Sequence, residues 1–178
     1  MANQKVSDLT GLAEPPASDD VLYVVDTSAT ASKKVQNKYI IQTDKISLNN
    51  SQVIALDDGG TAGEFQVLVA APGSGYMVVP LTVTFISTGA GSTQSNRKAL
   101  YIGYDVDQTD DFWVEYTYFM DGLASGDVVT LTGEAGSGSA RSSADSSIDN
   151  LALSVWSSGN FDGGWAVDIY ITYQIVKL

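Results

Sequence analysis

The chain has 178 residues and a formal net charge of −12, a length that suits one well-buried domain with a small appendage but not two full domains. It contains neither Cys nor His, which excludes disulfides, thiolate metal sites and Ser-His-Asp or Cys-His catalysis within one chain. No apolar run is as long as a membrane span, and the first residues lack the apolar core of a signal peptide. We therefore expect neither membrane insertion nor signal-directed export.

The negative charge is concentrated in the later part of the chain. Residues 1–45 carry a net charge of −1, whereas residues 46–178 carry −11. Such an acidic body repels nucleic-acid phosphates and anionic lipid, so we expect neither nucleic acid nor membrane as a partner. An acidic surface also serves simply to keep a protein in solution.

The N-terminal residues have the pattern of an attachment arm. Three apolar residues are spaced by one helical turn, but Pro15 and Pro16 prevent a helix from continuing. The β-prone run 21–25, a turn-rich stretch and the Lys-Lys-Val triplet at 33–35 predict a short hairpin, which is marginal in water without a partner. We predict that residues 1–45 bind another polypeptide through Val6, Leu9, Leu12, Val21, Tyr23, Val25, Lys33, Lys34 and Val35.

A linker is predicted at residues 46–63, between the arm and the body. Residues 39–42 and 52–56 each have the composition of a short strand, and turn-forming residues at 49–51 and 57–63 interrupt the chain. The domain boundary is expected near residues 59–63.

From residue 64 onward the pattern is that of β structure. Leu81, Val83 and Phe85 alternate with threonines, and a second long alternating segment runs from Trp165 to the end of the chain. Pro80 lacks a backbone donor and therefore predicts a sheet edge or a bulge. No window has a helical period. The fold class predicted is all-β, a jelly-roll-like antiparallel β-sandwich at 64–178, preceded by an extended N-terminal arm with a short hairpin.

Aromatic residues concentrate at 112–120. Trp113 and the tyrosines beside it, together with Trp156 and Trp165, would offer flat faces for stacking sugars. The alternative is that Trp156 and Trp165 fill the sandwich interior while Tyr116 and Tyr118 line a trimer interface, where such residues are enriched. We favour the second interpretation.

Two groups of acidic residues have the composition of a possible metal site or of a possible catalytic pair. One compact loop holds four carboxylates that together could bind Ca²⁺: Asp105, Asp107, Asp110 and Asp111. An EF-hand pattern fails there, because Asp110 stands where Gly is required and Tyr116 where Glu is required. Glu115 and Asp121 flank the aromatic window as a conceivable glycosidase pair, although nothing in the sequence brings them together. We expect solvated surface acids, with no metal, no cofactor and no enzymatic activity.

Several short motifs resemble those of tailed-bacteriophage virion proteins. In the arm these are Lys5-Val-Ser-Asp-Leu-Thr, the proline-containing linker and Lys33-Lys34-Val35. In the body, Val67-Leu-Val-Ala-Ala-Pro-Gly-Ser-Gly, Leu100-Tyr-Ile-Gly-Tyr and Asp168-Ile-Tyr-Ile-Thr-Tyr-Gln-Ile are similar to a β-sandwich module of phage head-decoration (cement) and fibre proteins. The stretch Gln36-Asn-Lys-Tyr-Ile departs from the arm pattern by being more polar.

The resemblance implies a non-enzymatic structural protein of the virion, made in the host cytoplasm and placed on the capsid exterior. It implies a homotrimer whose arm grips the major capsid protein and whose sandwich faces outward. The alternative is a tail fibre or tail-tip receptor-binding protein, whose arm enters a tail protein and whose aromatic window holds a host surface glycan.

Overall fold

The structure is a computed structural model, and it describes residues 40–57, 64–89, 98–104, 112–117, 119, 124–133, 149–163 and 165–178, together with the backbone of 21–24 and 33–36. The chain divides into two units, residues 1–40 and residues 41–178. The first unit is described by a two-stranded hairpin and the second by two four-stranded sheets.

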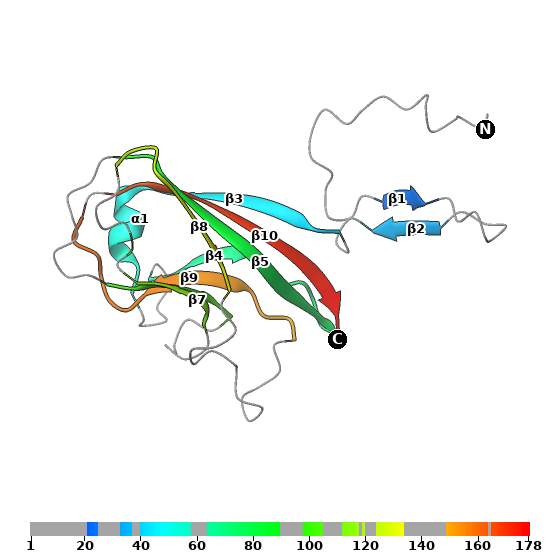
Figure 1. Cartoon of the computed structure of the whole chain (residues 1–178). Helices are drawn as coiled ribbons and strands as arrows, with labels where there is room; N and C mark the ends of the chain where they lie inside the picture. Colours follow the sequence, from blue (N-terminus) through cyan, green and yellow to red (C-terminus); the bar gives the residue numbers. More distant parts are fainter. Residues whose placement is uncertain are drawn as a thin grey trace. The chain divides into compact units, whose positions relative to one another are not determined.

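The first sheet of the body has the strand order β3-β10-β5-β8 (Figure 1). Its strands are β3 (Gln42–Leu48), β10 (Val167–Lys177), β5 (Tyr76–Ser87) and β8 (Val128–Thr132). The second sheet has the order β4-β9-β6-β7, with strands β4 (Gln66–Val69), β9 (Leu153–Ser157), β6 (Leu100–Gly103) and β7 (Phe112–Tyr116).

This strand order is that of a jelly roll. The first body strand pairs with the last, the second with the second to last, and so on inward to the β6–β7 pair, always antiparallel. Such nested pairs form one long ribbon that rolls up, and the β5–β10 and β6–β9 pairs join its turns into two sheets. The predicted fold class is confirmed.

The predicted hairpin in the first unit is also confirmed. β1 (Val21–Val24) pairs antiparallel with β2 (Lys33–Gln36) in the register Val21↔Gln36 to Val24↔Lys33. These two strands form a sheet of their own.

The segment predicted as the end of the arm and the linker differs from the structure. β3 covers residues 42–48 and pairs along its whole length with β10, so these residues belong to the sandwich. The strand predicted at 52–56 is instead helix α1 (Asn50–Ala55). The cause is a capping box, in which the Asn49 side chain accepts from the Gln52 N–H and the Gln52 side chain accepts from the Asn49 N–H, both at 3.0 Å.

The main core lies between the two sheets and includes Val83 and Phe85, which the alternation pattern indicated, but not Leu81, which is only partly buried. Val83, Phe85, Ile169 and Ile171 are at most 1% exposed. Trp165 is buried in this core, as predicted. Trp156 is buried too, but on the opposite face of β9 from Val155, in a smaller cluster that comprises Ala99, Tyr101 and Phe65.

The bulge predicted at Pro80 is present. The β5–β10 register shifts from Thr172↔Thr82 to Tyr173↔Pro80, so Leu81 is the extra residue. A bulge accommodates a residue that has no N–H to give to the ladder.

The two sheets also meet where Trp113 of β7 packs on Gly133, just after β8. A Cβ atom added to Gly133 would lie 1.9 Å from Trp113 Nε1, which means that the indole occupies the space of the missing side chain. β7 and β8 are edge strands of different sheets. This contact therefore closes one side of the sandwich.

We expect Gly133→Ala to lower the free energy of unfolding by about 2 kcal/mol, because the added methyl group forces the rigid indole out of its place. Chemical denaturation measures the change. Gly89→Ala is the matched control, since its Cβ would meet its nearest neighbours at an ordinary 3.6 Å. Equal losses in the two variants, or an undiminished loss from Gly133→Ala in a Trp113→Ala background, would contradict the proposed contact.

Candidate functional site

The predicted arm residues fall partly outside the described part of the chain. Val6, Leu9, Leu12 and Val25 lie there, so the structure leaves their role as a prediction. The other five lie on the hairpin: Val21 and Tyr23 on β1, and Lys33, Lys34 and Val35 on β2. The register pairs Tyr23 with Lys34, which brings the apolar run and the lysine pair into one two-stranded unit.

The tyrosine predicted at a trimer interface packs against its own chain. The ring of Tyr116 is half-buried, with its centroid 5.7 Å from that of Phe85 and 5.4 Å from that of Phe119. Phe119 is only 1% exposed. Tyr116 therefore covers the margin of the core, and its trimer contact stays a prediction. Tyr118 lies outside the described residues.

Trp156 and Trp165 do not offer sugar-stacking faces. Trp156 and Trp165 are 0% and 1% exposed, and the Trp156 ring lies 5.9 Å from Tyr101. Their indole N–H groups are buried and have no hydrogen-bond partner among the described residues. Both tryptophans therefore serve packing.

Most of the acidic residues singled out from the sequence lie outside the part of the chain that the structure describes. The loop with Asp105, Asp107, Asp110 and Asp111 lies outside it, as does Asp121. Glu115 is exposed on β7 and accepts a hydrogen bond from the Thr117 hydroxyl at 3.3 Å. Among the described residues no group of three or more Asp or Glu could hold a metal ion.

The outer face of the first sheet is a regular array in which uncharged polar side chains predominate. Three rows cross the four strands in the order β3, β10, β5 and β8. The rows are Ser47, Asp168, Ile86 and Val128; Lys45, Tyr170, Thr84 and Thr130; and Thr43, Thr172, Thr82 and Thr132. Hydroxyl pairs join neighbouring strands at 3.0 Å between Thr43 and Thr172 and at 2.9 Å between Thr84 and Thr130.

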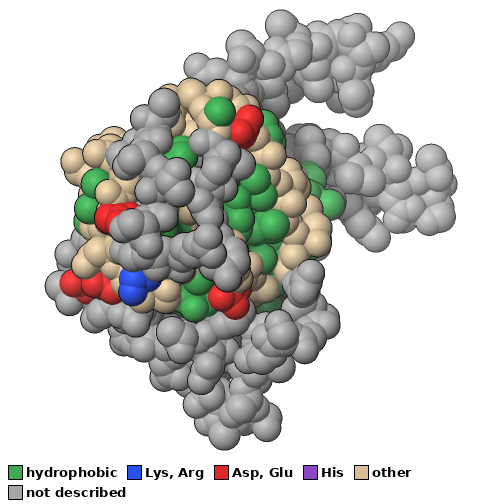
Figure 2. All heavy atoms as spheres, turned by 60° about the vertical axis from the view of Figure 1, so that its left-hand side comes forward, with side chains coloured by type: hydrophobic (Ala, Val, Ile, Leu, Met, Phe, Trp, Pro, Cys, Tyr) green, Lys and Arg blue, Asp and Glu red, His purple; other side chains and the backbone are tan. Residues whose placement is uncertain are grey.

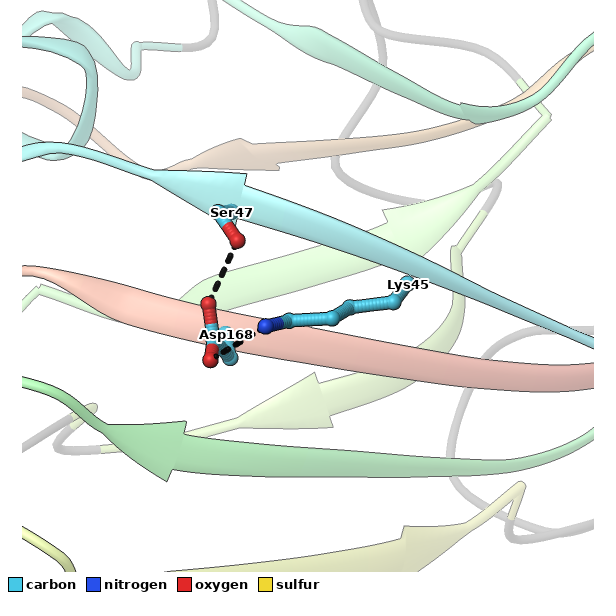
Figure 3. Close-up of polar contacts among 3 residues, drawn as sticks. All are labelled: Lys45, Ser47 and Asp168. Carbon is cyan, nitrogen blue, oxygen red and sulfur yellow. Dashed lines mark hydrogen bonds and ion pairs between the residues drawn. The ribbon is translucent and has the colours of Figure 1, made fainter.

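An ion pair between Lys45 and Asp168 lies on this face, and Ser47 completes the hydrogen bonding of the carboxylate (Figure 3). Lys45 Nζ lies 2.8 Å from Asp168 Oδ2, and the Ser47 hydroxyl donates to Asp168 Oδ1 at 2.5 Å. The hydrogen bonds from Lys45 and Ser47 hold the pKa of Asp168 below its usual value. The bond to Asp168 in turn raises the pKa of Lys45. No local pattern predicts this pair, because its members are 123 positions apart.

A second polar group lies on the inner side of the same two strands. The Tyr173 hydroxyl is 2.8 Å from Asp44 Oδ2 and 3.1 Å from Gln42 Oε1. Burial first, and then the Asp44 carboxylate, raises the pKa of Tyr173. Tyr173 therefore remains a neutral donor at physiological pH and ties the start of β3 to β10.

In both polar groups the side chains bond to each other across neighbouring strands. In the view of Figure 2, hydrophobic side chains (green) are visible over much of the described surface, and the acidic side chains (red) form separate patches. Neither polar group described above places two carboxylates together, as acid–base hydrolysis of a glycoside would require. No helix in the described ranges has the length and hydrophobicity to span a membrane.

Chains of two phage capsid structures are among the solved structures of similar form, while no family model and no curated protein matches the chain. A chain from the acidic stable capsid structure of Helicobacter pylori bacteriophage KHP30 is 11% identical, with a TM-score of 0.45 over 78% of this chain and 93% of that chain. A chain from the cyanophage Pam1 capsid asymmetric unit is 15% identical, with a TM-score of 0.36 over 97% and 98%. Both TM-scores lie below 0.5, a level at which similarity does not by itself identify a function.

We expect Asp168→Asn to remove a pH-dependent part of the stability. A carboxyl group whose pKa is lowered on folding stabilises the native state above its unfolded pKa, here 3.8, and this contribution disappears as the pH falls through the lower folded value. Wild type should therefore be more stable than the variant at pH 6, and the two should converge at pH 2.

Denaturant titrations at several pH values test this expectation. Glu115→Gln, which neutralises an exposed acid on β7, is the control. A constant difference between wild type and Asp168→Asn from pH 6 to pH 2 would show that the Lys45 and Ser47 contacts do not favour the ionised form.

Proposed function

We propose that this protein is a non-enzymatic structural component of a bacteriophage particle, a decoration or cement protein that binds the assembled shell through its N-terminal arm. The partner proposed is the major capsid protein, and the location proposed is the capsid exterior. A protein that binds the assembled shell but not its separate subunits stabilises the shell by mass action.

The observation that carries the proposal is the division of the chain into a complete body and an incomplete appendage. Residues 41–178 hold all eight strands of the jelly roll and a continuous core. The described part of residues 1–40 is a two-stranded hairpin in a sheet of its own. Because an isolated hairpin is marginal in water, it is suited to gaining stability from another polypeptide.

The distribution of charge supports the same roles. The body, residues 41–178, has a net charge of −11, whereas residues 1–40 have a net charge of −1 and carry a lysine pair on the hairpin. A strongly charged body stays solvated, and a nearly neutral arm approaches another protein without a large electrostatic cost. The sequence motifs that resemble those of phage virion proteins lie in both parts.

We propose in addition that three copies associate, as the resemblance implies. Tyr118, together with the exposed part of Tyr116, is the proposed contact. Tyr116 is partly buried, with its ring against Phe85 and Phe119.

We expect deletion of residues 1–40 to abolish attachment to undecorated particles while leaving the body folded. The body keeps every strand of the sandwich, so its circular dichroism and cooperative unfolding should persist. Co-sedimentation with undecorated shells measures attachment. Full-length Lys33→Glu/Lys34→Glu, compared with Lys98→Glu as a control on the body, tests the hairpin alone. Undiminished sedimentation of the truncated chain would refute the role of the arm.

Copy number separates this proposal from the tail-fibre alternative. A decoration protein is present in hundreds of copies per particle, whereas a fibre or tail-tip protein is present in a handful. Densitometry of purified virions decides between them. The burial of Trp156 and Trp165 already removes two of the aromatic faces that a glycan-binding fibre would use.

A further inference from the structure

The two central strands of the first sheet extend beyond their neighbours. β3 begins at Gln42, opposite Tyr173 of β10, and β8 ends at Thr132, opposite Thr82 of β5. Beyond these points, residues 76–79 of β5 and residues 174–177 of β10 continue to pair with each other, and no other described strand extends alongside them. We call this part the projecting ribbon; in Figure 1 its strands run together to the C-terminus.

The β5 edge of the projecting ribbon is closed by contacts from elsewhere in the chain. The Tyr76 carbonyl accepts from the Asn150 N–H at 2.9 Å, and the Val78 carbonyl accepts from the Tyr104 hydroxyl. Pro80, the next residue on this side, has no N–H. An edge protected in this way does not pair with another strand.

These same contacts fix where the backbone groups of β10 point. In an antiparallel sheet the N–H and C=O of one residue point to the same side, and consecutive residues alternate. Because Tyr76 and Val78 point away from β10, Met77 and Val79 point toward it and bond to their partners Val176 and Gln174. The N–H and C=O groups of Ile175 and Lys177 must then point to the opposite side, along the line of β3.

No described residue pairs with Ile175 or Lys177 on that side. We call this the β10 edge. Two exposed aliphatic side chains bracket it, Ile41 just before β3 at 61% exposure and Leu178 just after β10 at 58%. An open row of backbone groups between apolar side chains has the form of a site for an added strand.

We propose that the β10 edge accepts the β1–β2 hairpin of a second copy of this chain. Each hairpin strand has four residues, and the ribbon has four positions beyond β3. Residues 21–36 carry a net charge of +1 against −11 on the receiving body, so the pairing is electrostatically favourable although two bodies repel each other. The hairpin also gains the neighbouring strand that it needs to be stable.

This contact joins two different surfaces and is therefore heterologous. Repetition of a heterologous contact closes into a ring or continues as a chain of copies. The contact is tested between copies in solution, so its outcome is independent of the proposed attachment to a shell, which would use the arm as a whole, hairpin included.

Disulfide trapping tests the proposal, because the natural chain has no Cys to confuse the result. One preparation carries Val176→Cys on the ribbon, and two others carry Leu22→Cys or Val35→Cys on the hairpin. After mild oxidation, mixtures of ribbon and hairpin variants should give disulfide-linked dimers. The reason is that Cβ atoms on neighbouring strands lie about 4.5–5.5 Å apart, which is close enough for a disulfide to form. Thr84→Cys, in the middle of the same sheet, is the control for random collision.

A yield no higher than that of the Thr84→Cys control for both hairpin variants would overturn the proposal. So would an intramolecular disulfide in a chain that carries both cysteines, because the hairpin would then occupy the edge of its own copy.

A backbone variant provides the second measurement. Lys177→Pro removes one donor from the β10 edge and spares the ladder to β5, whereas Lys177→Ala removes the side chain and keeps the donor. Sedimentation velocity over a concentration series should show about fivefold weaker self-association for Lys177→Pro and no change for Lys177→Ala. A wild-type chain that stays monomeric at all concentrations, or equal association in both variants, would contradict the proposal.

Discussion

The pairing of β5 with β10 is the interaction on which the rest of the body depends. The two strands pair from Val167↔Ser87 to Lys177↔Tyr76, which makes this ladder the longest in the body. Their inward residues, among them Val83, Phe85, Ile169 and Ile171, lie in the main core. β3 and β8 attach to its two sides, and the second sheet covers its inner face. Both the core and the available sheet edges therefore follow from this one pair.

The long strands could be predicted because their signal is local. Alternation of apolar and polar residues depends only on neighbours two positions apart, and it is clear from Leu81 to Phe85 in β5 and along most of β10. The bulge at Pro80 could be predicted for an equally local reason, because proline lacks the N–H that a regular strand position donates to its neighbour. The hairpin of residues 21–36 was predicted from its turn, and its backbone register agrees.

The segments that sequence reasoning missed depend on partners far away in the chain. β3 presents Thr43, Lys45 and Ser47 to solvent, so its composition resembles a linker until β10 supplies the other half of the sheet. A six-residue helix completes fewer than two turns and leaves no period to detect. The Lys45–Asp168 pair and the contact of Tyr104 with Val78 are likewise products of strand order, which local patterns do not encode.

The two edges of the projecting ribbon differ in how far other parts of the chain cover their backbone groups. Open edges invite uncontrolled pairing, so proteins close those that have no use. On β5 three separate devices do this, namely Pro80, the Tyr104 hydroxyl and the Asn150 N–H. On β10, β3 occupies every position up to Tyr173 and leaves only the last four. An added strand is thereby limited in length and register, because β3 blocks any slide toward Val167. A short open edge with a fixed end favours one specific partner over stacking of many chains.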